Sequence, residues 1–136
     1  MRVAIVKAAY DDEAAVWYVE HSDVEGLHVE GDSFEVFCKN VAIGVGDLVS
    51  SESAADVHVE IIAHGLCAGE GRSVRDFGRP ARDKLKDAGC ALLRHGKGDH
   101  DLWVTAEGKR IVVTAKIKSR YTANGILKDA GLPKAF

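Results

Sequence analysis

Cysteine is scarce in this chain, and a long apolar run is missing. The three cysteines (Cys38, Cys67 and Cys90) are scattered and form no CxxC pair, which favours reduced thiols over a disulfide framework or a zinc site. The apolar run MRVAIVKAAY at the start is followed by acidic residues, is far too short to span a bilayer, and lacks the flanks of a signal peptide. We therefore expect a cytoplasmic protein without membrane contact.

Basic residues are nearly missing from the first part of the chain. Residues 1–71 hold three basic and fourteen acidic residues, a net charge of −11, whereas residues 72–136 hold fifteen basic and seven acidic ones, a net charge of +8. Such asymmetry is typical of a nucleic-acid-binding part joined to an acidic part, although two solvated surfaces of different sign give the same numbers. Opposite charges also favour a contact between the two parts, within one chain or between subunits of a homo-oligomer.

The acidic part has the pattern of a small α+β domain, which we place at residues 1–63. RVAIVKAA, AVWYVEH, LHVEG and VHVEIIA have the composition or the alternation of β-strands. Between the third and fourth of these, Asp32 followed by Glu35 matches the start of a capping box. Apolar residues then recur at helical spacing from Phe34 to Leu48. The predicted order is β-β-β-α-β.

A glycine-rich segment, residues 64–73, separates this part from a basic domain that we place at residues 74–136. The 136 residues of the chain suit two small domains as well as one. In the basic domain, apolar residues from Phe77 to Ala88 line one face of a predicted helix, which Gly89 ends.

Three strands and a second helix follow. ALLRH, HDLWVT and RIVVTA, separated by turns, predict an antiparallel meander. The second helix is expected to begin at a Thr122 cap and to end at Gly131. The order α-β-β-β-α with a positive charge is the layout of a double-stranded-RNA-binding-like fold, which contacts phosphates and 2′-hydroxyls rather than base sequence.

Basic residues gather in the loops and strand ends of this domain. Such loops are commonly solubilising surfaces, but three clusters on one small domain favour polyanion binding. The candidate RNA-binding residues are Arg94, Lys97, Gly98, Arg110, Lys116, Lys118 and Arg120.

His100, in the stretch HGKGDHDLW, is the candidate catalytic residue. RNA is cleaved without a metal when a base takes the 2′-hydroxyl proton and an acid protonates the 5′-oxygen, and histidine suits either role. The ordinary alternative is a polar residue beside a turn. Consecutive side chains of a strand point to opposite faces, so Asp99 and Asp101 would face away from His100, and we expect no metal and no other cofactor.

Residues 72–136 resemble the HicA family of mRNA interferase toxins. The stretches LKDAGC, GKGDHDLW and KIKSRYTANGILKDAGLPKAF carry the likeness. The resemblance implies a double-stranded-RNA-binding-like fold, mRNA as substrate, and a catalytic role for His100. Asp99 stands where many HicA members have serine, and is a candidate for orienting the imidazole.

Residues 1–68 resemble the amino-terminal domain of HicB antitoxins, a partial RNase-H-like unit. The matching stretches are YDDEAAVWYVEHSDVEGL and VHVEIIAHG. HicB-like proteins commonly carry a further DNA-binding segment; this sequence shows none, so we expect no binding to operator DNA. The two resemblances together predict a toxin–antitoxin fusion, an endoribonuclease covered by its own inhibitory half. The alternatives are a non-catalytic RNA-binding or inhibitory module, and a structural two-domain protein without affinity for nucleic acid.

Overall fold

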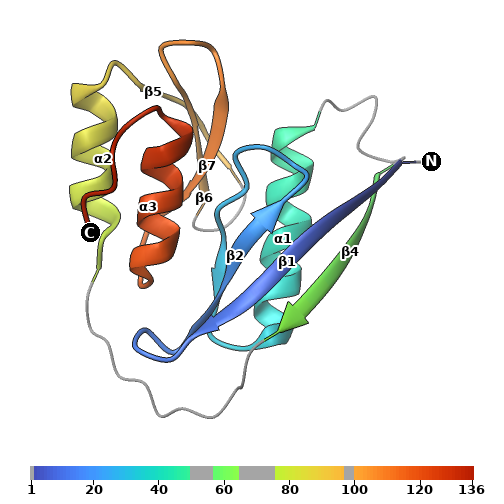
Figure 1. Cartoon of the computed structure of the whole chain (residues 1–136). Helices are drawn as coiled ribbons and strands as arrows, with labels where there is room; N and C mark the ends of the chain where they lie inside the picture. The colour runs from blue at the N-terminus through green and yellow to red at the C-terminus, as the bar shows by residue number, and fades with distance from the viewer. Residues whose placement is uncertain (1, 50–56, 65–75, 97–99) are drawn as a thin grey trace.

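The computed structural model describes residues 2–49, 57–64, 76–96 and 100–136 (Figure 1). Cys67, Lys97, Gly98 and Asp99 lie outside these ranges, as does the predicted linker except for its first residue. Within the described residues the chain forms two sheets and three helices, an α+β arrangement. The two parts of the chain are called here the amino-terminal half (residues 2–64) and the carboxy-terminal half (residues 76–136).

The amino-terminal half is a four-stranded sheet with one helix against it (Figure 1). The strand order is β3-β2-β1-β4, and β4 runs parallel to β1 while the other neighbours are antiparallel. The helix crosses from β3 at one edge to β4 at the other. Its elements are β1 (Arg2–Asp11), β2 (Val16–Ser22), β3 (Glu30–Gly31), α1 (Phe34–Leu48) and β4 (Val57–His64).

Alternation in β1 explains how this sheet meets its helix. Ala4, Val6 and Ala8 are buried on one face and share a core with Phe37 and Val41 of α1. The strand predictions for β1, β2 and β4 are confirmed.

Two local predictions in the amino-terminal half are wrong. LHVEG forms a ladder only at its last two residues, although Leu27 and Val29 are buried as a strand would bury them. The helix cap is Ser33 rather than Asp32, because the Ser33 hydroxyl accepts a hydrogen bond from the backbone N–H of Val36 at 3.1 Å.

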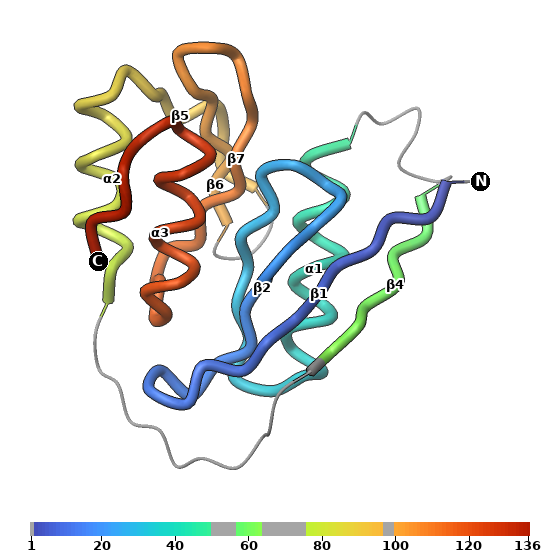
Figure 2. Tube along the Cα trace, in the orientation of Figure 1, coloured from blue at the N-terminus to red at the C-terminus, as the bar shows by residue number. Residues whose placement is uncertain are grey.

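The carboxy-terminal half is a three-stranded antiparallel meander with two helices on one face (Figure 2). The meander prediction is confirmed, with strand order β5-β6-β7. Trp103 and Ile111 pack with Leu85 and Ile126 of the two helices in one core. The elements are α2 (Gly78–Asp87), β5 (Ala91–His95), β6 (His100–Val104), β7 (Arg110–Thr114) and α3 (Arg120–Asp129).

The start of α3 differs from the prediction. Ser119 is the cap: its hydroxyl accepts from the backbone N–H of Tyr121 at 3.2 Å, whereas Thr122 lies inside the helix and is buried. The helix therefore begins three residues earlier than expected, and its first turn carries Arg120 and Tyr121.

The second sheet is buried on both faces. Trp103 faces α2 and α3, while Leu102 and Val112 belong to the core of the amino-terminal half. Because side chains alternate along a strand, one sheet supplies apolar residues to both cores. The two halves are therefore packed together through a shared apolar layer within one chain.

Candidate functional site between the halves

The strand register decides where His100 faces. His100 pairs with Thr114, and Leu102 pairs with Val112 across the same ladder. His100 and Leu102 are two residues apart, so they lie on the same face of the sheet, which is the face that the amino-terminal half covers. His100 is only 4% exposed. The candidate catalytic histidine is thus enclosed at the contact between the halves.

A hollow of about 580 Å³ adjoins His100 and is lined by both halves. From the carboxy-terminal half come His100, Thr114, Lys116 and Lys118. From the amino-terminal half come β3 and the side of α1 that carries Lys39 and Asn40. Three sequence-predicted residues, namely His100 and the two lysines, therefore meet at one place.

Glu30 places a carboxylate at the beginning of α3. Its two oxygens accept hydrogen bonds from the backbone N–H groups of Lys118 and Ser119, each at 2.8 Å. Burial raises the pKa of Glu30 above its ordinary value, and the backbone hydrogen bonds from Lys118 and Ser119 offset part of that effect. The amino-terminal half thus occupies two backbone donors at a helix N-terminus, where anions bind favourably.

Asp11 reaches the same helix start. Its Oδ2 accepts a hydrogen bond from the Ser119 hydroxyl at 2.7 Å, while its Oδ1 accepts from the backbone N–H of Glu13 and of Ala14 in the turn after β1. Asp11 and Ser119 are both buried. The β1–β2 turn and the start of α3 are thereby held in one hydrogen-bonded arrangement.

Ion pairs join basic residues of the carboxy-terminal half to acidic residues of the amino-terminal half. Lys118 Nζ lies 2.9 Å from Asp32, and Arg120 Nη2 lies 2.8 Å from Glu13. Arg94 also pairs with Asp47 of α1, at 3.0 Å. Three of the candidate RNA-binding residues are therefore paired with acidic residues of the other half.

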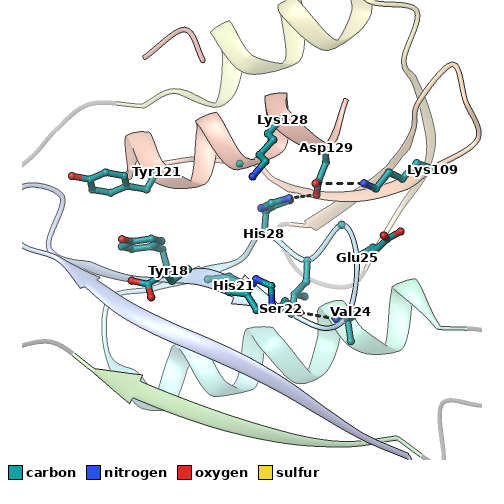
Figure 3. A pocket seen from close by; sticks show the side chains of 15 residues that line it. Tyr18, His21, Ser22, Val24, Glu25, His28, Lys109, Tyr121, Lys128 and Asp129 are labelled. Carbon is teal, nitrogen blue, oxygen red and sulfur yellow. Dashed lines mark hydrogen bonds and ion pairs between the residues drawn. The ribbon is translucent and has the colours of Figure 1, made fainter. Parts of the chain in front are cut away.

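A second hollow of about 430 Å³ is lined by β2, the segment that follows it, Lys109 and α3 (Figure 3). His28 points from the amino-terminal half to Asp129, with 2.5 Å between Nε2 and Oδ2, and Lys109 reaches the same carboxylate at 3.6 Å. Burial raises the pKa of Asp129, but hydrogen bonds and charge from His28 and Lys109 outweigh it, and the net shift is downward. At the other end the rings of Tyr18 and Tyr121 stack.

The family of the chain follows from its amino-terminal half. The model of DUF1902, a domain of unknown function, matches residues 3–75, more than half of the 136 residues. The chain belongs to the DUF1902 family. No curated protein and no solved structure matches the chain. The DUF1902 match covers the half that contributes Glu30, Asp11 and Asp32, and it ends before α2.

Arg110 lies apart from the other candidate residues of this DUF1902 protein. It begins β7 at the end opposite Thr114 and lines a different hollow with Arg2, Asp23 and Glu25. Lys116 is exposed at the hollow beside His100. The structure thus brings together Lys116, Lys118 and His100 but not Arg110; Lys97, Gly98 and Asp99 stay predictions.

The backbones of the two halves meet at the edge of β7. The Val112 N–H donates to the Gly26 carbonyl at 2.9 Å, and Gly26 has a φ of +84°. A Cβ at Gly26 would lie 2.0 Å from the Arg110 carbonyl oxygen. The DUF1902 half therefore covers the open edge of the second sheet with a residue that has to be glycine.

Asp101, the described neighbour of His100, points to a different partner. Its carboxylate lies 2.7 Å from His95 Nδ1, as the alternation of side chains along β6 predicts. Among the residues that the structure describes, no group of three or more His, Cys, Asp or Glu residues is arranged to hold a metal ion. No helix in the described ranges is long and apolar enough to cross a membrane.

The interface residues of the amino-terminal half were not predicted individually. The acidic composition of residues 1–71 indicated that this half would meet a basic surface, but Glu30 and Asp11 carry no local motif. Their partner Ser119 lies 89 and 108 residues away along the chain. The Tyr18–Tyr121 and His28–Asp129 contacts are equally long-range, so no local spacing announces them.

Proposed function

We propose that this protein is a metal-independent endoribonuclease of HicA-like type, kept closed by a HicB-like amino-terminal half. One observation carries the proposal: His100 lies on the sheet face that the acidic half covers, beside the candidate RNA-binding lysines. The order α-β-β-β-α in the carboxy-terminal half and β-β-β-α-β in the amino-terminal half is also that of the double-stranded-RNA-binding-like and partial RNase-H-like folds.

The cleavage step that we propose needs one proton acceptor and one proton donor. A 2′-hydroxyl gives its proton to a base, its oxygen bonds to the adjacent phosphorus, and the bond from phosphorus to the 5′-oxygen breaks as that oxygen is protonated. His100 takes one of these two roles. Lys116 and Lys118 are placed beside it to balance the negative charge that gathers on the phosphate.

In the closed chain the acidic half stands where RNA would lie. Glu30 accepts the hydrogen bonds of two backbone N–H groups that a phosphate would otherwise accept, and Asp32 and Glu13 pair with Lys118 and Arg120. Apolar packing through Leu102 and Val112 adds to these contacts. Activity therefore requires the halves to separate at this interface.

The test uses the full chain with its interface opened by Gly26→Ala. This variant is expected to cleave single-stranded RNA, with a rate unchanged by a chelator. Adding His100→Ala should abolish cleavage and leave RNA binding largely intact, because the phosphate contacts are made by other residues. Undiminished cleavage by the double variant would refute the role of His100. If Gly26→Ala alone binds RNA without cleaving it, the proposed nuclease function is wrong and the protein is an RNA-binding module.

A further inference from the structure

Tyr121 is an exposed aromatic residue next to a basic one. It lies in the first turn of α3 directly after Arg120, and it is 53% exposed. Its ring stacks on that of Tyr18, with centroids 5.2 Å apart and an interplanar angle of 19° (Figure 3). Aromatic rings beside basic side chains are the usual platforms on which proteins stack unpaired RNA bases.

The partner that covers Tyr121 has an arrangement like that of a nucleotide. Tyr18 of β2 is the cross-strand neighbour of Glu30 of β3, so the ring and the carboxylate project from the same face of one sheet. The ring lies on Tyr121, and the carboxylate accepts from the N–H groups of Lys118 and Ser119. An aromatic ring and an anion thus contact two adjoining places at the start of α3, the first turn and the residues just before it, as the base and the phosphate of a nucleotide would.

The space beside the ring pair extends this surface. The 430 Å³ hollow runs along α3 from Tyr121 past Gly125 to Lys128, and Lys109 lies at its far end (Figure 3). Tyr121 and Lys128 are seven residues apart on one helix, so they lie on nearly the same face, two turns apart. The surface next to Tyr121 therefore has a lysine two turns away on the same face of the helix.

We infer that Tyr121 is a nucleobase-stacking residue of the carboxy-terminal half, and that Tyr18 with Glu30 occupies its nucleotide position in the closed chain. The inference rests on the proposed RNA function and deepens it, because it names a residue that contacts a base and the group that competes for it. Tyr18 and Tyr121 then have opposite roles: one contacts RNA, and the other excludes it.

The test compares Tyr18→Ala with Tyr121→Ala in the full chain, each in the Gly26→Ala background. The probe is a labelled single-stranded RNA of ten nucleotides, with an abasic strand of the same length as control. Tyr121→Ala should weaken binding of the RNA by about 5- to 150-fold, the range given by loss of one base stack, and should leave binding of the abasic strand unchanged. Tyr18→Ala should tighten binding of the RNA, and Tyr121→Phe should retain it.

The two single variants remove the same ring contact, which makes their comparison decisive. A purely structural contact predicts that Tyr18→Ala and Tyr121→Ala shift RNA binding in the same direction, and this result would overturn the inference alone. Equal losses for RNA and for the abasic strand in Tyr121→Ala would do the same. No binding by Gly26→Ala itself would overturn the proposed RNA function and this inference with it.

Discussion

Gly26→Ala should open the interface between the halves, and Gly108→Ala is its matched control. Both glycines have a positive φ, +84° and +89°, so either substitution costs roughly 1–2 kcal/mol of backbone strain. They differ in their surroundings. A Cβ at Gly26 meets the Arg110 carbonyl oxygen at 2.0 Å, whereas a Cβ at Gly108 has nothing within 4 Å.

The clash at Gly26 can be met in two ways. Separating the two backbones breaks the 2.9 Å hydrogen bond from the buried Val112 N–H and leaves it unpaired, at about 1–3 kcal/mol. Keeping them together overpacks the contact, which also costs about 1–3 kcal/mol. Either way the cost is roughly 1–3 kcal/mol beyond the control, and its lower limit corresponds to an increase of about 5-fold in the open population.

Hydrogen exchange at the Val112 amide measures this opening directly, because that N–H points away from β6 and is protected by Gly26. We expect its exchange in Gly26→Ala to be at least about 5-fold faster than in Gly108→Ala, the increase estimated above. A urea melt checks that both variants still unfold cooperatively. Equal protection of Val112 in the two variants would refute the reasoning that the halves are held together at this edge.

The salt and pH dependence of the protein give two further predictions. In the Gly26→Ala background, replacing Lys118 and Arg120 with alanine should reduce the dependence of RNA binding on salt. The slope of the logarithm of the binding constant against the logarithm of the salt concentration should fall by roughly 1.4 for single-stranded RNA, while Lys84→Ala of α2 leaves it unchanged. An equal loss of slope from Lys84→Ala would contradict a local phosphate contact. Because burial raises the pKa of Glu30 above its ordinary 4.5, its contribution to stability is largest below that value and is lost as pH rises through the raised pKa. Glu30→Gln should therefore gain stability relative to the wild type in urea melts as the pH rises above 4.5. A difference in stability that stays constant with pH would contradict a raised pKa for Glu30.

The elements with strong local periodicity were predictable from sequence. For the docking of the halves, the sequence indicated only that their opposite charges attract. The meander and three of the strands of the amino-terminal sheet follow from alternation and turns. The Ser119 cap does not, because Asp11, which holds its hydroxyl, lies 108 residues away. Thr122 has the right chemistry for a cap, but the helix begins where tertiary hydrogen bonds favour it.

The candidate site shows the same division. The sequence places His100 at the start of a strand and groups basic residues in loops. It does not indicate which face of that strand would be covered, since Leu102 and Trp103 are both apolar and face opposite cores. The amino-terminal half decides this by packing on the Leu102 face, and this packing places His100 at the interface.

The central claim is that the amino-terminal half holds a nuclease closed, and the RNA cleavage rates of wild type, Gly26→Ala and Gly108→Ala at physiological salt test it most directly. The account predicts a rate for Gly26→Ala at least about 5-fold above that of the wild type, with Gly108→Ala close to the wild type. Cleavage by the wild type as fast as by Gly26→Ala would contradict an inhibitory role for the amino-terminal half.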